Sequence, residues 1–146
     1  MIALKQNKKY TMKKQTGVWI DSSKAIIVKL VNGKESTIEI ESEIENRVHH
    51  QGDGDKGSFM GSRHINSEKK FDERKKQQID TFLKNVIEQI KKDDELYVFG
   101  PAEIKLKLKV LIEDDHQLSS KLKSIESSDS MTHNQVVAKT KKFYSI

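Results

Sequence analysis

Two tight turns near the start of the chain constrain its fold more than any other feature. The stretch GVWIDSSKAIIVKLVNGKESTIEIESEI (residues 17–44) contains the turn sequences DSSK at 21–24 and NGK at 32–34. Asn-Gly between apolar runs is typical of a hairpin turn, and turns this short join antiparallel strands. The stretch therefore predicts an antiparallel meander with strands over 18–20 and 25–31, and a third strand through residues 38–44.

The three expected strands differ in hydrophobic pattern. The first two are nearly continuous in apolar residues, whereas Ile38 and Ile40 alternate with charged residues and Ile44 continues the pattern less regularly. A continuous apolar run indicates a strand covered on both faces, and alternation indicates one face in water. We therefore expect the third strand to lie near an edge of the sheet.

A long helix is expected in the middle of the chain. Residues 79–90 carry an apolar stripe at helical spacing, made of Ile79, Phe82, Leu83, Val86, Ile87 and Ile90. The preceding SEKKFDERKKQQ (67–78) is charged, with Phe71 as its one large apolar residue. Such a pattern predicts a helix that begins well before it reaches the core.

The C-terminal part adds two strands and two helices. ELYVF (95–99) is typical of a buried strand, and Gly100-Pro101 ends it. Residues 102–115 fit both a strand and a helix, and the proline start together with the Leu and Lys content favours a helix. KLKSIES (121–127) predicts a weaker last strand. Thr132 and Gln135 form a capping-box pattern at the start of a last helix with one apolar face.

This order of elements predicts one α/β domain of ribonuclease H-like topology, βββαβαβα, with helices packed on a mixed sheet of about five strands. Helical crossovers join parallel strands, so the C-terminal half is expected to be parallel and the N-terminal half antiparallel. Ile87 and Phe143 are expected to reach the core from the helices. The residues expected at the centre of the sheet are Val18, Trp19, Ile20, Ile27, Val28, Tyr97, Val98 and Phe99.

Composition limits the classes of function. A chain of 146 residues without cysteine has the size of one domain and holds neither a disulfide framework nor a thiolate zinc site. No apolar run approaches the roughly 20 residues that span a bilayer, so we expect a cytoplasmic protein without membrane contact. The net charge of +5 favours an acidic partner such as RNA, although such a charge also serves solubility alone.

Several stretches resemble a known family. GVWIDSSKAIIVKL (17–30), the long basic helix, YVFGPAEIKLKLK (97–109) and MTHNQVVAKTKKFY (131–144) are similar to the small bacterial members of the archaeo-eukaryotic release factor family. The single domain of those proteins is similar to the central domain of class-one release factors and of Pelota. The resemblance implies a domain over 16–146, an N-terminal extension over 1–15, a mixed sheet and a role in translation.

The resemblance also directs attention to the loop QGDGDKGSFMGSRHIN (51–66). In catalytic members a loop at this place carries a glycine-glycine-glutamine tripeptide that enters the ribosomal peptidyl-transferase centre. Here Gly61, Ser62 and Arg63 stand nearest that position. The one glutamine of the loop, Gln51, precedes Gly52, which reverses the order of the tripeptide. Arginine donates hydrogen bonds and binds phosphate but cannot accept a hydrogen bond from an attacking water. Peptidyl-tRNA hydrolysis is therefore disfavoured. It remains the alternative function, for which this loop would have to act differently from the loop of the catalytic members.

A basic tract beside this loop predicts binding to the ribosome, rRNA or tRNA without catalysis. Cationic side chains near a phosphate backbone release counterions on binding. A solvated helix face is the alternative explanation, because Glu68, Asp72 and Glu73 dilute the tract. The candidate contacts are Arg47, His49, His50, Lys56, Gly61, Ser62, Arg63, His64, Lys69, Lys70, Arg74 and Lys75. Residues 50–66 are expected to be the least ordered internal segment.

Neither a metal nor another cofactor is expected. His49, His50, Asp53, Asp55 and His64 are possible ligands, but glycines surround them and no regular spacing holds them together. Asp21 follows the first strand, where a nuclease of ribonuclease H-like topology would place a metal-binding carboxylate, and such an enzyme is the second alternative. Because Asp21 also opens a good turn sequence, a structural role is favoured there. The sequence leaves the oligomeric state open.

Overall fold

The computed structural model describes residues 13–44, 61–101 and 103–146, and of residues 61–66 the backbone alone. Its elements are β1 (Lys14–Ile20), β2 (Lys24–Val31), β3 (Lys34–Glu41), α3 (Gly61–Ile90), β4 (Glu95–Gly100), α4 (Ile104–Asp114), a 3₁₀ turn (Ser119–Lys121), β5 (Leu122–Ser127) and α5 (His133–Phe143). The predicted order of strands and helices is confirmed.

The strands form one mixed five-stranded sheet in the order β3-β2-β1-β4-β5. β1 pairs antiparallel with β2, which pairs antiparallel with β3, while β1–β4 and β4–β5 are parallel. The predicted α/β fold is therefore confirmed, including the edge position of β3. The NGK turn is also confirmed, because Asn32 and Gly33 both have positive φ (56° and 79°), as a two-residue hairpin turn with the twist of the strands requires.

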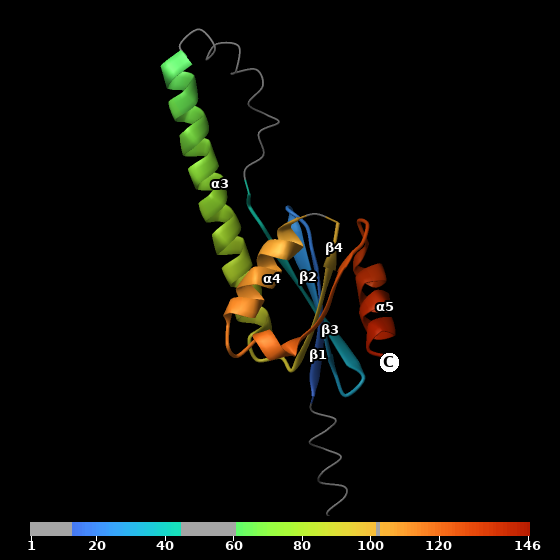
Figure 1. Cartoon of the computed structure of the whole chain (residues 1–146). Coiled ribbons are helices and arrows are strands. Elements are labelled where there is room, and N and C mark those ends of the chain that lie inside the picture. The colour runs from blue at the N-terminus through green and yellow to red at the C-terminus, as the bar shows by residue number, and fades with distance from the viewer. Residues whose placement is uncertain (1–12, 45–60, 102) are drawn as a thin grey trace, which may run out of the picture.

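Helices cover both faces of the sheet (Figure 1). α3 and α4 pack on one face, where Val18, Ile20 and Ile27 point, and α5 packs on the other face, over Trp19, Ile26 and Val28. All residues predicted for the centre of the sheet are buried. Ile87 and Phe143 pack against the two clusters as partly buried side chains.

Residues 104–114 form a helix, as expected from the proline start. Ile104, Leu108 and Ile112 recur every four residues and are buried, which is the period of a helix packed on a sheet. At the end of the chain the predicted capping box is present, because Thr132 Oγ1 accepts from Gln135 N and Gln135 Oε1 accepts from Thr132 N.

Three boundaries differ from the sequence interpretation. α3 begins at Gly61, so residues 61–66 belong to the helix and not to the loop expected over 51–66. Glycine and serine are both well suited to the start of a helix, and nothing in GSRHIN breaks one. β3 ends at Glu41, and Ile44 packs on the core from outside the strand. β1 begins at Lys14, four residues before the strand expected over 18–20.

A buried carboxylate joins the two halves of the sheet. Asp93, in the turn between α3 and β4, is fully buried and accepts a hydrogen bond from Thr16 Oγ1 of β1 at 2.7 Å. Lys29 Nζ of β2 lies 3.4 Å from the other carboxylate oxygen, and it also donates to the carbonyl of Gln89 in α3. A buried charge is tolerated where an opposite charge and hydrogen bonds surround it.

Replacing Lys29 tests this network. Lys29→Met should lower the free energy of unfolding by about 3 kcal/mol, because it leaves a buried carboxylate without its counter-charge. Urea denaturation measures the change. Lys34→Met, at an exposed lysine of β3, is the control and should change stability by less than about 0.5 kcal/mol. Equal effects of the two substitutions would contradict the role of the ion pair.

Candidate nucleic-acid interface

α3 extends beyond the sheet on which it packs (Figure 1). A helix of 30 residues is about 45 Å long, whereas strands of six to eight residues span about 20–26 Å. The C-terminal part of α3 buries Phe82, Leu83, Val86 and Ile90 in the core. Residues 67–78 lie beyond it, and there the apolar stripe gives way to charged side chains.

The structure brings part of the predicted site together on this projecting part of α3. Lys69, Lys70 and Arg74 are exposed, and Lys75 is half-buried. The backbone of Gly61, Ser62, Arg63 and His64 forms the first turns of the same helix. The remaining predicted contacts, Arg47, His49, His50 and Lys56, lie outside the described residues, as does most of the segment expected to be least ordered.

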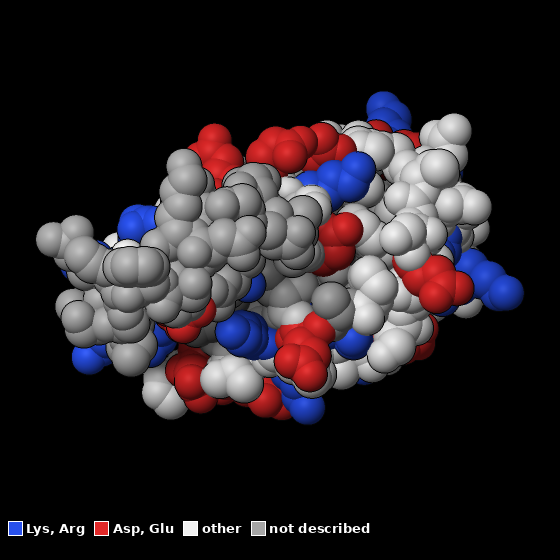
Figure 2. Space-filling view, turned by 90° about the horizontal axis from the view of Figure 1, so that it is seen from above, with Lys and Arg blue, Asp and Glu red and all other residues white. Residues whose placement is uncertain are grey.

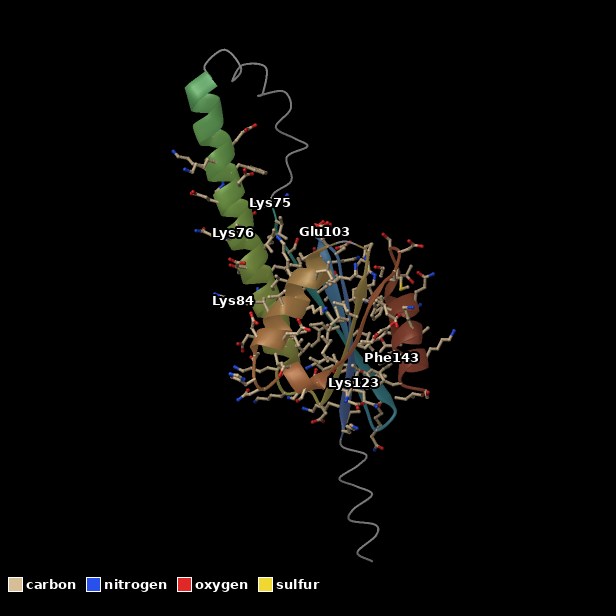
Figure 3. All side chains as sticks on the ribbon, in the orientation of Figure 1. Lys75, Lys76, Lys84, Glu103, Lys123 and Phe143 are labelled. Atoms are coloured by element: carbon tan, nitrogen blue, oxygen red, sulfur yellow. The ribbon has the colours of Figure 1, made fainter. Side chains whose placement is uncertain are left out.

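Five lysines of α3 have no ion-pair partner among the described residues. Within the described residues, no ion pair or side-chain hydrogen bond involves Lys69, Lys70, Lys75, Lys76 or Lys84. Elsewhere some lysines are paired with carboxylates, as in Lys24–Glu39, Lys123–Glu95, Lys139–Glu126 and Lys141–Glu35, and others, such as Lys34 and Lys107, are not. An unpaired ammonium group can contact a phosphate without first giving up an internal partner. Lys76 and Lys84 project from the outer side of α3 (Figure 3).

Lys84 was not among the predicted contacts. It lies within the apolar stripe of the sequence, between Leu83 and Val86, and a helical projection is needed to place it on the outer side of α3. The pattern of residues 79–90 contains this signal, whereas the contacts predicted from the sequence all lie before residue 76, in and beside the glycine loop.

The described surface around α3 carries both signs of charge. Seen from above the end of α3, blue and red side chains are interspersed (Figure 2). Glu68, Asp72, Glu73 and Asp80 lie among the lysines along the helix. The surface therefore offers separate cationic contacts and not one broad positive field, and this limits the strength of long-range attraction.

A groove separates α3 from α4. It has a volume of about 570 Å³, an apolar floor and a charged rim. Its lining residues are Asp72, Lys75, Lys76, Ile79, Asp80 and Leu83 of α3 and Lys107, Val110 and Leu111 of α4. They recur three or four residues apart on each helix, so the groove runs between two facing stripes. No sequence pattern pointed to it, because it needs the two helices side by side.

Phe71 is a buried apolar side chain in the projecting segment. Its side chain is 6% exposed, although it precedes the main apolar stripe by eight residues. The Arg74 guanidinium carbon lies 6.0 Å from the centre of the Phe71 ring, at the outer limit of a cation–π contact. Arg74 is therefore engaged with its own helix, and the neighbouring lysines are the freer cations.

Asp21 has the structural role that its turn sequence predicts. Its Oδ1 accepts hydrogen bonds from the backbone N–H groups of Ser23 and Lys24, both at 2.8 Å. Glu95 stands at the start of β4, and because β1 and β4 are parallel it lies at the opposite end of the sheet from Asp21. Among the described residues, no group of three or more His, Asp or Glu side chains is placed to hold a metal ion.

Other acidic groups away from α3 are paired. Glu39 of β3 contacts His133 of α5 at 2.6 Å, and this hydrogen bond, together with one to Glu41, lowers the pKa of Glu39. Burial acts to raise the pKa of Glu95, but hydrogen bonds from Gln15 and Lys13 outweigh it, so that the pKa is lowered. These carboxylates are occupied by internal partners.

Two substitutions of Asp21 separate a turn from a metal site. Asp21→Ala should lower the free energy of unfolding by about 1–2 kcal/mol, because two N–H groups are left without their acceptor. Asp21→Asn keeps an oxygen acceptor and should cost less than half as much. Urea denaturation with and without Mg²⁺ or Mn²⁺ measures both. Stabilisation of the natural protein by either metal, abolished in Asp21→Asn, would contradict the turn interpretation.

Comparisons with known proteins bear on the fold. No protein-family model matches the sequence, and no curated protein matches it either. Among solved structures, Archaeoglobus fulgidus Pelota is similar over 97% of this chain, with a TM-score of 0.55 and 10% sequence identity. This chain therefore shares the fold of part of that Pelota. It spans 35% of the length of that Pelota, so the likeness covers one part of a larger protein.

Two further structures are more distantly similar. The archaeal translation termination factor aRF1 matches with a TM-score of 0.42 and 13% identity over 89% of this chain and 38% of its own. The ParM protein of psk41 matches with a TM-score of 0.44 and 14% identity over 91% of this chain and 40% of its own.

No helix in the described part of the chain is both long and apolar enough to cross a membrane.

Proposed function

We propose that this protein is a translation-associated domain that binds the ribosome through RNA, by the projecting half of α3, and that it does not hydrolyse peptidyl-tRNA. The observation that carries the proposal is the set of α3 lysines without an ion-pair partner among the described residues, most of which lie beyond the end of the core. A rigid helix that presents unpaired cations away from the domain suits contact with a phosphate backbone.

The fold supports a role in translation. The sheet and helices are similar to those of part of Pelota, and the sequence resembles the release factor family in the first strands, β4–α4 and α5. In that family the segment between the third strand and the long helix is the one that enters the ribosomal peptidyl-transferase centre. Here the projecting half of α3 follows directly on that segment, so its lysines would be presented to the same surroundings.

The absence of catalysis is proposed from the sequence. The position next to the glycine and serine at 61–62 holds Arg63, which cannot accept a hydrogen bond from a water molecule. A permanently charged guanidinium in that place suits phosphate binding. Binding without hydrolysis is the function that both the helix and this substitution favour.

A charge-matched pair of variants tests the binding surface. The first replaces Lys69, Lys70, Lys75 and Lys76 by Ala, and the second replaces the ion-paired Lys24, Lys123, Lys139 and Lys141 by Ala. Each removes four positive charges, so net charge alone affects them equally. Cosedimentation with ribosomes over a salt series should show weaker binding for the first variant. Its log–log salt slope should be smaller by about one unit for each phosphate that the variant no longer neutralises. Equal weakening in both variants would mean that binding depends on net charge and not on α3.

A peptide-release assay tests the proposed lack of catalysis. Ribosomes that carry peptidyl-tRNA should release no more peptide with the protein than without it, because Arg63 replaces the glutamine of catalytic members. Release that disappears when Gly61 and Ser62 are deleted would overturn this part of the proposal. The binding experiment would then still decide whether α3 is the contact, since it measures association and not turnover.

A further inference from the structure

Six lysines gather at the end of the sheet that lies opposite the projecting half of α3 (Figure 1). β1, β4 and β5 run parallel and begin at this end, next to the turn that follows α3. Lys123 marks the position in Figure 3. The six residues form the strand-start surface and are Lys13, Lys14, Lys91, Lys92, Lys121 and Lys123. They make this end of the domain a candidate for contact with an anion.

Contacts between the elements hold these lysines in one surface. Glu95, at the start of β4, lies 3.2 Å from Lys13 Nζ and 3.7 Å from Lys123 Nζ, so a single carboxylate contacts ammonium groups beside both of its neighbouring strands. Lys121 Nζ donates to the carbonyl of Lys91 at 3.3 Å. The starts of three strands and the turn after α3 therefore present their lysines side by side.

The carboxylates of this surface already have partners within the domain. Asp94 accepts a hydrogen bond from the backbone N–H of Lys14 at 2.8 Å, and Glu88 lies 3.8 Å from Lys91 Nζ. Glu95 is shared by two lysines. Six lysines outnumber these three carboxylates, so the strand-start surface has a net positive charge. Along the projecting half of α3 the two signs are more nearly balanced.

The helix dipole explains only part of this set of lysines. Cations that follow a helix offset the partial negative charge of its C-terminal end, and this accounts for Lys91 and Lys92 after α3. Lys13, Lys14 and Lys123 lie at the starts of β1 and β5, and strands in a sheet carry little net dipole. Their position calls for an anionic partner outside the domain.

The composition of the surface favours a polyanion over a protein or a membrane. Protein interfaces have an apolar centre, and helices that lie on a membrane bury apolar side chains in it. None of the large apolar side chains exposed in the described part of the chain belongs to this surface, since they are Leu106, Val110, Leu111 and Ile146. A nucleic-acid backbone offers many phosphates in a row, which suits lysines spread over the starts of three strands. Glu113 and Asp114, at the end of α4, limit the positive charge on that side.

We propose that the strand-start surface is a second RNA-contact site, which binds the phosphate backbone of a different RNA segment from the one at α3. The identity of the partner rests on the proposed function, and the second point of contact goes beyond it. Lys69 and the end of α3 at this surface are about 30 Å apart along the helix. A domain with contacts at both of these ends holds two RNA segments at once.

Energy transfer between two labelled RNA duplexes tests this arrangement. One short duplex carries a donor fluorophore and a second carries an acceptor, and the natural protein should bring them together. The strand-start variant leaves Glu95 its contact with Lys123 and replaces by Gln the residues Lys13, Lys14, Lys92 and Lys121. It should lose most of the energy transfer, while fluorescence anisotropy still shows one duplex bound through α3. Undiminished transfer in this variant would overturn the proposal, and so would the absence of transfer with the natural protein.

Three further variants serve as controls for charge and folding. A charge-matched variant, which should keep the transfer, replaces by Gln the residues Lys24, Lys109, Lys139 and Lys141. Equal loss in the two Gln variants would mean that net charge alone is responsible and would overturn the proposal. Arginine at the four strand-start positions keeps the charge and should keep the transfer. If the Gln variant does not fold, as judged by circular dichroism, Lys92→Glu at an exposed turn residue should still lower the transfer severalfold, and no change would overturn the proposal.

The α3 variant of the ribosome experiment separates this inference from the proposed function. It should lose the transfer but still bind one duplex, and adding the strand-start substitutions should weaken that remaining binding about tenfold or more. Transfer lost only in the strand-start variant would contradict the contact at α3 alone. Loss of all duplex binding in the α3 variant would overturn the second site. Flotation with phosphatidylserine vesicles tests the other source of phosphate: vesicle binding that the strand-start variant loses, with its RNA transfer intact, would assign the surface to a membrane and overturn the proposal.

Discussion

The buried carboxylate of Asp93 is the interaction on which the arrangement of the two halves of the sheet depends. It is bound by Thr16 of β1 and Lys29 of β2, and it lies in the turn that ends α3 and starts β4. The next residue, Asp94, exchanges two hydrogen bonds with the backbone of Lys14, through its N–H and its carboxylate. These contacts fix where β4 begins opposite β1 and hence the register of the parallel pair.

The same contacts determine which part of α3 extends beyond the sheet. Because the C-terminal end of α3 is held at this turn, all of its extra length extends in the other direction, past the end of the sheet. Phe82, Val86 and Ile90 fasten the C-terminal part to the core. The rest carries lysines that form no ion pair with a carboxylate of the described structure. The position of the candidate contact surface therefore follows from the position of an anchor at the opposite end of the helix.

Local patterns in the sequence were sufficient to predict most of the fold but little of the candidate site. Hairpin turns, hydrophobic periods and a capping box act over a few residues, and they correctly predicted the meander, the helical nature of 104–114 and the start of α5. Contacts between distant residues leave no such pattern. The sequence around Gly17 does not indicate that a Cβ at this position would lie 2.1 Å from Thr140 Oγ1 of α5. Nor does the sequence around Lys29 indicate that its side chain contacts Asp93. For the same reason the groove between α3 and α4, and the lack of ion-pair partners for the α3 lysines among the described residues, became visible only in three dimensions.

The helices on the two faces of the sheet differ in how many of their side chains have partners within the domain. On one face α5 is tied down by Tyr144, whose hydroxyl donates to the carbonyl of Thr16, and by the stacking of Phe143 on Tyr97 with ring centres 3.9 Å apart. Its lysines and His133 also find carboxylates on neighbouring strands. On the other face, α3 carries lysines without an ion-pair partner in the described part of the chain, and α4 carries exposed apolar side chains. Selection for stability alone would pair or replace such groups, since each is neutral or unfavourable for an isolated domain. Their concentration in one layer makes this a part of the described surface that remains open to contacts outside the domain, and the proposed contact of the α3 lysines with phosphate uses it.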